Sequence, residues 1–541
     1  MKKARFAARR AVPLSIVWAL AIGLATPAPA DTLIDNVDGF TLDKDGAIER
    51  LNGLLIGDDG RIVQVLHRGD KRPGKVTYLL DGKGRVLMPG LIDAHVHVMD
   101  LGFGALTLDL SMAKSLAEAQ ARIAAYAAAH PDRPWIIGRG WNEERWGLGR
   151  VPTTAELDAA VANRPAWLVR ADGQAGWANS AALRAARVTA GTPPDAAMAA
   201  VRKAVPAPRP EDRDLALALA QDQLLRRGVT AVADMGTTIE DWQAFRRAGD
   251  LGSLRVRIMA YAAGTEAMSL IGGPGPTPWL YDDRLRLNGV QISVDGSLGS
   301  RGGLLKTPYA DAPGRSGRAL LDDTQLRNLM SRAAIDRFQV AVDASGDKAA
   351  AMVLNAIGEL SDTYKGDRRW RIERAQVVDT ADLARFGQHG IVVSLQPEQQ
   401  SADRLVAEAR LGPARLAGAF AWASLAKTGA RLAFGSGAPE HGPDPFAGIA
   451  VAATRQDAEG QPFGGWQPQE RVTREAALAA YTTGAAYAGF AEGRFGRLAT
   501  GLRADFVLID RDPLMTGPGD LRATNVLETW VGGRKVWAAG K

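Results

Sequence analysis

Eight short apolar runs, separated mostly by segments rich in Ala, Leu and Arg, constrain what this 541-residue chain can fold into. They lie near Leu91–His97, Val229–Met235, Val256–Tyr261, Leu287–Val294, Gln339–Asp343, Trp370–Ala375, Ile391–Gln396 and Leu432–Ser436. Several are apolar without interruption, as strands covered on both faces are. Eight strand–helix alternations predict an α/β fold, a TIM-type (β/α)8 barrel.

Both ends of the chain carry short strand-like runs and turns in place of this alternation. Neither end is long enough to bury a core alone, so residues 31–88 and 488–541 are predicted to form one composite β domain. The barrel is then expected over residues 89–487. A stretch rich in Trp, Arg and Pro, at about residues 130–215, is predicted to be an insertion between the first and second barrel strands.

Residues 1–30 have the pattern of an export signal: a basic start, an apolar run and a small-residue end at Ala28-Pro29-Ala30. The five positive charges of the basic start are Lys2, Lys3, Arg5, Arg9 and Arg10. Their removal leaves 61 basic residues against 60 acidic ones, which lowers the net charge from +6 to +1 and removes the case for nucleic-acid binding. We expect a periplasmic or secreted protein without a membrane span. The choice between general secretion and twin-arginine export stays open.

A motif at the first predicted strand, Pro89 to His97, carries two histidines at alternate positions. Alternate side chains of a strand share one face, so His95 and His97 could bind one divalent cation such as zinc. The chain has no Cys, which excludes any Cys-ligated metal site.

Several longer motifs accompany the histidine pair, and together they resemble the amidohydrolase superfamily of metal-dependent hydrolases, in the branch called amidohydrolase family 3. They are Gly138–Glu143, Val151–Asp158, Asp295–Arg301, Ser345–Asp347, Thr454–Asp457 and the tail from Gly501 to Pro513. The resemblance implies a (β/α)8 barrel beside a β domain, and hydrolysis of non-peptide C–N bonds by metal-activated water. It also implies metal ligands on four strands: the first-strand His pair, a carboxylated Lys on strand four, and His on strands five and six. An Asp on strand eight would ligate metal and transfer protons.

The chain departs from that ligand set at nearly every position. Gln291 stands at the strand-four Lys position, Asp343 and Arg374 stand at the two later His positions, and Gly437 stands at the Asp position. An amide cannot be carboxylated, a guanidinium has no lone pair to give, and glycine has no side chain. Two substrate-proximal His positions are likewise taken by Gln174 and Gln399.

Three functions fit these departures. The first is a catalytically degenerate amidohydrolase, a pseudoenzyme or ligand-binding protein that holds a divalent metal weakly or not at all. In it, Asp343 and Arg374 are predicted to pair in the former metal site. The second is an active hydrolase with a mononuclear site of His95, His97 and Asp343, for which Glu440 or Glu373 would have to supply the base.

The third function is an interaction or scaffold protein without a small ligand. For either of the first two, we expect a small amide-like ligand, and the candidate pocket residues are Trp141, Arg301, Gln174 and Gln399. His441, beside Glu440 in the loop after the last strand, is expected to be a solvated loop residue.

Overall fold

The computed structural model describes residues 30–171, 173 and 175–540, so the predicted export segment and Gln174 lie outside the described residues. Eight strands form one sheet in which each pairs in parallel with the next. They are β8 (Leu91–Val96), β13 (Val229–Thr237), β14 (Arg257–Ala263), β15 (Leu285–Ser293), β16 (Gln339–Ala344), β17 (Arg371–Arg374), β18 (Val392–Leu395) and β19 (Arg431–Phe434). All eight predicted strands are therefore confirmed.

The sheet closes on itself just beyond the carboxyl end of β19. The amide of Gly437 donates to the carbonyl of His95 at 2.8 Å, and the amide of His97 donates to the carbonyl of Ala438 at 2.9 Å. Val96 and Ala438 form a parallel bridge. These bonds satisfy the outer edges of β8 and β19, which would otherwise stay unpaired. The segment that closes the barrel thus also carries the predicted site positions.

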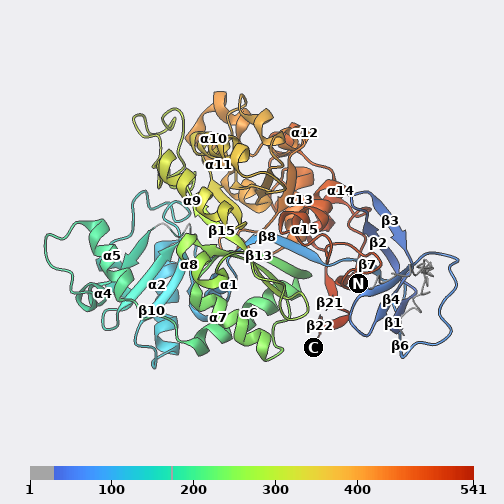
Figure 1. Cartoon of the computed structure of the whole chain (residues 1–541). Coiled ribbons are helices and arrows are strands. Elements are labelled where there is room, and N and C mark those ends of the chain that lie inside the picture. The colour runs from blue at the N-terminus through green and yellow to red at the C-terminus, as the bar shows by residue number, and fades with distance from the viewer. Residues whose placement is uncertain (1–29, 172, 174, 541) are drawn as a thin grey trace, which may run out of the picture.

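Helices surround this sheet and give the predicted TIM-type barrel (Figure 1). They are α1 (Val98–Leu106), α6 (Pro210–Arg226), α7 (Ile239–Asp250), α8 (Gly264–Gly272), α9 (Asp323–Ile335), α10 (Asp347–Thr363), α11 (Pro397–Leu411), α12 (Trp422–Lys427), α13 (Pro445–Thr454), α14 (Arg474–Ala480) and α15 (Thr483–Ala488). Outside the masked positions, no helix combines the length and apolar character needed to cross a bilayer.

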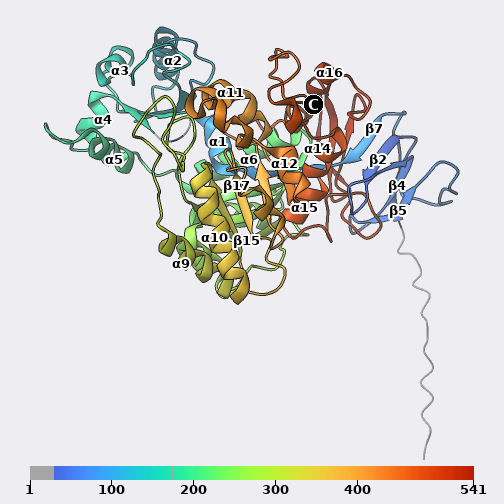
Figure 2. The same ribbon diagram turned by 90° about the horizontal axis from the view of Figure 1, so that it is seen from above.

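A small separate layer is inserted between α1 and α6, and it projects to one side of the barrel in both views (Figures 1 and 2). Its four-stranded sheet consists of β9 (Leu108–Asp109), β10 (Ile136–Trp141), β11 (Ala166–Arg170) and β12 (Gly176–Ala178). Its helices are α2 (Leu116–Ala129), α3 (Thr154–Ala160), α4 (Ser180–Ala185) and α5 (Pro194–Ala204). The insertion therefore begins upstream of the predicted residue 130, because β9 and α2 also belong to it. It ends before α6, which packs against α1 of the barrel.

Strands from both chain ends build a β domain on the other side of the barrel (Figure 2). One sheet has the order β5-β4-β1-β6, and the other has the order β22-β21-β20-β7-β2-β3. The amino-terminal strands are β1 (Ala30–Asp35), β2 (Asp38–Leu42), β3 (Ile48–Leu51), β4 (Gly53–Gly57), β5 (Ile62–Leu66), β6 (Tyr78–Asp81) and β7 (Val86–Pro89). The carboxyl-terminal elements are β20 (Phe506–Ile509), α16 (Pro518–Arg522), β21 (Val526–Val531) and β22 (Arg534–Ala538). Because β20 pairs with β7, the two ends share one core, as predicted.

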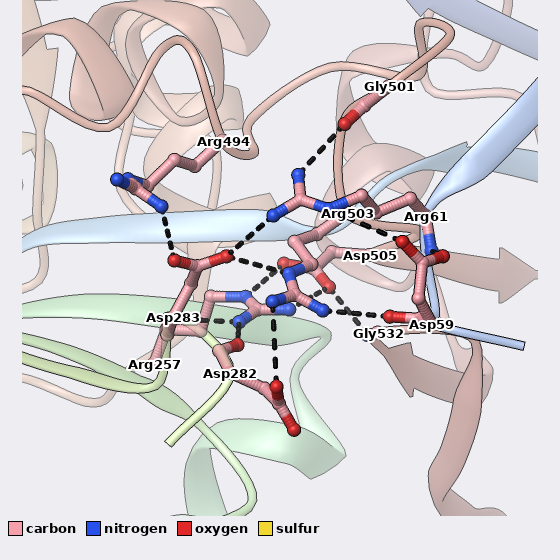
Figure 3. A network of polar contacts seen from close by, with 10 residues as sticks. All are labelled: Asp59, Arg61, Arg257, Asp282, Asp283, Arg494, Gly501, Arg503, Asp505 and Gly532. Atoms are coloured by element: carbon pink, nitrogen blue, oxygen red, sulfur yellow. Dashed lines mark hydrogen bonds and ion pairs between the residues drawn. The ribbon is translucent and has the colours of Figure 1, made fainter. Parts of the chain in front are cut away.

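Buried ion pairs join the β domain to the barrel (Figure 3). Arg257 of β14 donates twice to Asp505, with distances of 2.6 and 2.8 Å, and both side chains are buried. Asp283, just before β15, accepts from Arg503 at 2.7 Å and also from Arg494. Burial acts to raise the pKa of Asp283, but the hydrogen bond and charge of Arg503 outweigh it, so the pKa lies below its usual 3.8. The β domain is therefore fixed to the barrel by charge.

Replacing Asp505 by Asn should destabilise the protein strongly, because Arg257 would stay buried without its counter-ion. Removing one partner of a buried pair costs about 3–5 kcal/mol. Equilibrium urea unfolding measures this change. Glu359→Gln is the control, since its ion pair with Arg327 is exposed and is worth about 0–1 kcal/mol. Equal effects of the two substitutions would contradict a structural role for the buried pair.

Candidate functional site

The predicted site positions meet at the carboxyl ends of the barrel strands. His95 lies on β8 and His97 directly follows it, Gln291 lies on β15, and Asp343 and Arg374 lie on β16 and β17. Gly437 lies just after β19. Because parallel strands end at the same edge of a barrel, these residues converge there, where barrels of this type hold their sites.

His95 is fully buried and is held by a charged chain inside the barrel. Its Nδ1 donates to Oε2 of Glu373 at 2.8 Å, and Oε1 of Glu373 accepts from Nε of Arg371 at 2.7 Å. Arg371 also donates to the hydroxyl of Tyr261 at 2.9 Å. This chain fixes the His95 ring through its Nδ1, and its Nε2 is buried without a hydrogen-bond partner among the described residues.

The His97 ring is fixed in the same manner by a backbone group. Its Nδ1 donates to the carbonyl of Met235 at 2.7 Å, which leaves Nε2 with a free lone pair. Burial and the neighbouring His95 lower the pKa of His97, so the ring is held neutral. The two ring centroids lie 5.5 Å apart. Hydrogen bonds of this kind normally orient histidines that bind metal, and both survive in this chain.

Arg374 is the cation that faces Asp343, and its main partner is Glu440. Its two terminal nitrogens donate to the two Glu440 oxygens at 3.0 and 3.3 Å. Its Nε lies 3.5 Å from Oδ1 of Asp343, so the predicted Asp343–Arg374 contact exists but is an ion contact without a hydrogen bond. Burial acts to lower the pKa of Arg374, but the charges of Glu440 and Asp343 outweigh it and raise the pKa. The guanidinium therefore stays charged.

Gln291 and Asp343 bind each other. The amide nitrogen of Gln291 donates to Oδ2 of Asp343, and the hydroxyl of Ser293 donates to the same oxygen at 3.3 Å. Asp343 is thus occupied on one side by neutral donors and on the other by Arg374. Gly437, just after β19, contributes no side chain to this cluster. A Cβ at this position would lie 3.3 Å from Cγ of Gln396.

This residue set does not fit the metal centre that the family resemblance implies. Two imidazoles keep free Nε2 atoms, but the guanidinium of Arg374 takes the third position and cannot donate a lone pair. Across the described residues, no three His, Asp or Glu side chains gather into a group that could hold a metal ion. The alternative site of His95, His97 and Asp343 is therefore not assembled, because Gln291 and Arg374 engage the Asp343 carboxylate.

The two candidate bases do not replace the missing Asp either. Burial acts to raise the pKa of Glu373, but the charge of Arg371 and the hydrogen bond from His95 lower it to about 2. Burial likewise opposes the ionised form of Glu440, yet the charge and hydrogen bonds of Arg374 lower its pKa below the usual 4.5. Carboxylates with a lowered pKa are weaker proton acceptors.

A cavity of about 350 Å³ opens above this cluster, at the mouth of the barrel. Its walls come from the insertion, the loop after β15, α11 and the loop after β19. The lining residues are Asn142, Glu143, Glu144, Arg145, Arg170, Ala171, Ser297, Gly299, Ser300, Gln399, Ala402, Asp403, Val406, Glu440 and His441. Glu440 belongs to both features, so its pair with Arg374 forms the boundary between the cavity and the strand-end cluster.

Of the predicted pocket residues that the structure describes, one lines this cavity and two do not. Gln399 lines the cavity. Trp141 is buried in the core of the insertion, where its indole donates to the carbonyl of Leu168 at 2.9 Å. Arg301 pairs with Asp311 at 2.8 Å and is absent from the described lining. His441, expected to be solvated, lines the cavity, and burial lowers its pKa.

Sequence reasoning missed the charged residues that shape this cavity. Glu143 pairs with Arg170 at 2.9 Å, and Glu144 pairs with Arg410 at 2.8 Å. Burial and the charge of Glu440 raise the pKa of Asp403 to about 7. Glu143 ends one of the motifs quoted above, which was a usable signal. Asp403 lies on α11 with no motif around it.

Comparisons with known proteins agree with this architecture. A family model described as Amidohydrolase family matches residues 79–537. LONG AFTER FAR-RED 3 of Arabidopsis thaliana is 31% identical over 96% of this chain and 94% of its own length. N-substituted formamide deformylase of Arthrobacter pascens is 26% identical over 84% of this chain and 89% of its own. The crystal structure of an uncharacterized metal-dependent hydrolase from Pyrococcus horikoshii is similar with a TM-score of 0.75 and 26% identity, over 90% of this chain and 99% of that one.

Glu373→Gln should destabilise the protein more at pH 7 than at pH 3. The folded pKa of about 2 lies below the ordinary 4.5, so the stabilisation by this carboxylate is complete above pH 4.5 and is lost as the pH falls toward 2. At pH 7 the loss should be about 3–5 kcal/mol, because Arg371 stays buried without its counter-ion. Urea unfolding of both proteins at the two pH values measures it. An equal loss at both would contradict the ionised pair.

Proposed function

The chain belongs to the amidohydrolase family, and we propose that it is a catalytically degenerate member that binds a small amide-like ligand without hydrolysing it. The observation that carries the proposal is the position of Arg374, which bonds to both oxygens of Glu440 and touches Asp343 where the family resemblance places a metal ligand. A permanent cation at that position repels a divalent ion and donates no lone pair to it.

The mouth cavity supports the binding half of the proposal. Its volume of about 350 Å³ falls in the range of small-molecule sites. Its wall contains hydrogen-bond acceptors and donors. Asp403 offers an acidic group, Arg145 a basic one, and Gln399 a neutral amide. An amide ligand presents one N–H and one carbonyl, and such a wall can satisfy both.

Metal analysis together with a substrate panel tests the loss of catalysis. The purified protein is incubated with zinc or manganese, freed of excess metal, and assayed with N-substituted formamides and N-acyl amides. We expect less than stoichiometric metal and no hydrolysis. Stoichiometric metal with turnover, both lost in His95→Ala, would overturn the proposal.

Returning ligands to the strand ends should create a metal site. The double variant Asp343→His, Arg374→His would add two imidazoles to His95 and His97, whose Nε2 atoms are already oriented. We expect zinc to bind this variant and not the wild type, as measured by isothermal titration calorimetry. The matched control Asp343→Asn, Arg374→Gln removes the same charges but adds no imidazole. Equal zinc binding by the two variants would count against the assignment.

Ligand binding can be tested without any assumption about catalysis. Ligands that bind only the folded protein raise its melting temperature. A thermal-shift screen with N-acetyl and N-formyl amino acid amides should find at least one that stabilises the wild type. The shift should disappear in Arg145→Ala, which alters the cavity wall, and persist in Arg327→Ala on the exposed face of α9. A screen without such a compound would argue against the binding role.

We further propose that residues 1–30 direct export and are removed, on the basis of their charge and hydropathy pattern alone. Amino-terminal sequencing of the protein from the periplasmic fraction of a bacterial host should begin at Asp31. Retention of the intact amino terminus in the cytoplasm would refute this.

A further inference from the structure

A second cavity, of about 290 Å³, lies at the opposite, amino-terminal end of the barrel strands. It opens where β15, β16 and β17 begin. Four basic side chains surround it: Arg286 from β15, Arg337 from the turn before β16, and Lys365 and Arg368 from the turn before β17. This end of a barrel ordinarily serves stability, so a collection of like charges there calls for a separate explanation.

These cations lack strong counter-ions. Within the described part of the chain, no carboxylate pairs with Arg286, Arg337 or Arg368. Lys365 reaches only Asp362, at 3.4 Å and in full exposure to solvent. The one acid in the cavity wall, Asp367, is already taken by Arg369 at 2.9 Å. Like charges gathered around one cavity repel each other unless an anion joins them.

Two buried polar atoms of this cavity also lack hydrogen-bond partners among the residues that the structure describes. Asn288 is 3% exposed, and its Nδ2 donates to the carbonyl of Gly489 at 2.6 Å while its Oδ1 is unpartnered. The Nε of Arg368 is buried without a partner too, although its Nη1 reaches the carbonyl of Ala334. Buried polar atoms without a partner are energetically unfavourable. Both residues line the cavity, so a ligand there could satisfy both atoms.

The unsatisfied atoms specify the ligand. The Nε of Arg368 needs an acceptor, and Arg286, whose Nε donates to the carbonyl of Thr277 at 3.2 Å, has no carboxylate partner among the described residues. Guanidinium groups bind phosphate oxygens particularly well. Oδ1 of Asn288 requires a donor. Inorganic phosphate supplies one because HPO4²⁻ keeps a proton at neutral pH, whereas a monoester, whose last proton leaves with a pKa of about 6, supplies one only in its less populated protonated form. Sulfate carries the same charge but has no proton to donate. The cavity therefore favours phosphate over sulfate.

We infer that the cavity between the starts of β15, β16 and β17 is a phosphate site, which takes free phosphate or the phosphate group of a small monoester. Arg286 and Arg368 hold the oxygens, Oδ1 of Asn288 accepts a hydrogen bond from the remaining P–OH, and the exposed Arg337 and Lys365 attract the anion from solution. Burial lowers the pKa of Arg286, and a bound dianion would oppose that shift. The site lies at the other end of the barrel from the mouth cavity, so it stands independently of the proposed ligand there.

Isothermal titration calorimetry at fixed ionic strength tests the inference, with inorganic phosphate, glycerol phosphate and sulfate as probes. We expect saturable binding of one or both phosphate compounds. Sulfate should bind more weakly by about tenfold or more, because one lost hydrogen bond to a charged ligand is worth about 1.5–3 kcal/mol. Tighter binding of glycerol phosphate would identify a monoester as the ligand. Tighter binding of inorganic phosphate would identify the free ion.

Variants separate this site from diffuse attraction to a basic surface. Arg368→Gln and Arg286→Gln should each weaken phosphate binding by about tenfold or more. Arg337→Gln is an exposed replacement that should fold normally and weaken binding less. The control Arg318→Gln, in an exposed loop beyond the carboxyl end of β15, should bind as the wild type does. No saturable binding, or equal affinity for phosphate and sulfate in wild type, cavity variants and control, would overturn the inference.

Discussion

The site at the mouth of the barrel depends on one constraint: the positive charge of Arg374 must be neutralised by nearby acids. Its side chain is 14% exposed, and at this depth a charge must be paired with carboxylates. Glu440 supplies two hydrogen bonds and Asp343 supplies an ion contact. Arg374 also adopts a φ of 72°, a left-handed conformation that is costly for a residue with a side chain. The contacts with both acids offset that cost, and they leave neither acid free for a metal.

Below Arg374, the imidazoles of His95 and His97 are oriented by hydrogen bonds as metal-binding histidines normally are, but the described residues form no metal-binding group. Glu373 and Met235 orient the two imidazoles, and Arg371 balances the charge of Glu373 inside the barrel. Glu373 is buried and ionised, so it needs a neighbouring cation, and Arg371 supplies one from the same strand at 2.7 Å. The buried chain therefore contributes to the stability of the barrel whether or not any chemistry takes place above it.

The sequence allowed the barrel and the composite β domain to be predicted, because apolar runs and ordered motifs are local signals. The partner of Arg374 was not predictable in this way. The register of β16 and β17 places Asp343 opposite Glu373 and leaves Arg374 opposite Ala344. The guanidinium therefore turns toward Glu440, in a loop whose path depends on how the barrel closes. Trp141 was misplaced for a related reason: its motif indicated a pocket, but the insertion uses the ring for its own core.

Anomalous diffraction at the zinc absorption edge, from crystals grown with zinc, tests most directly whether Arg374 excludes a metal. We expect an ordered Arg374 bonded to Glu440 and no anomalous peak between the imidazoles of His95 and His97. A fully occupied zinc ion about 2.0–2.1 Å from both Nε2 atoms, with Arg374 displaced, would contradict this expectation.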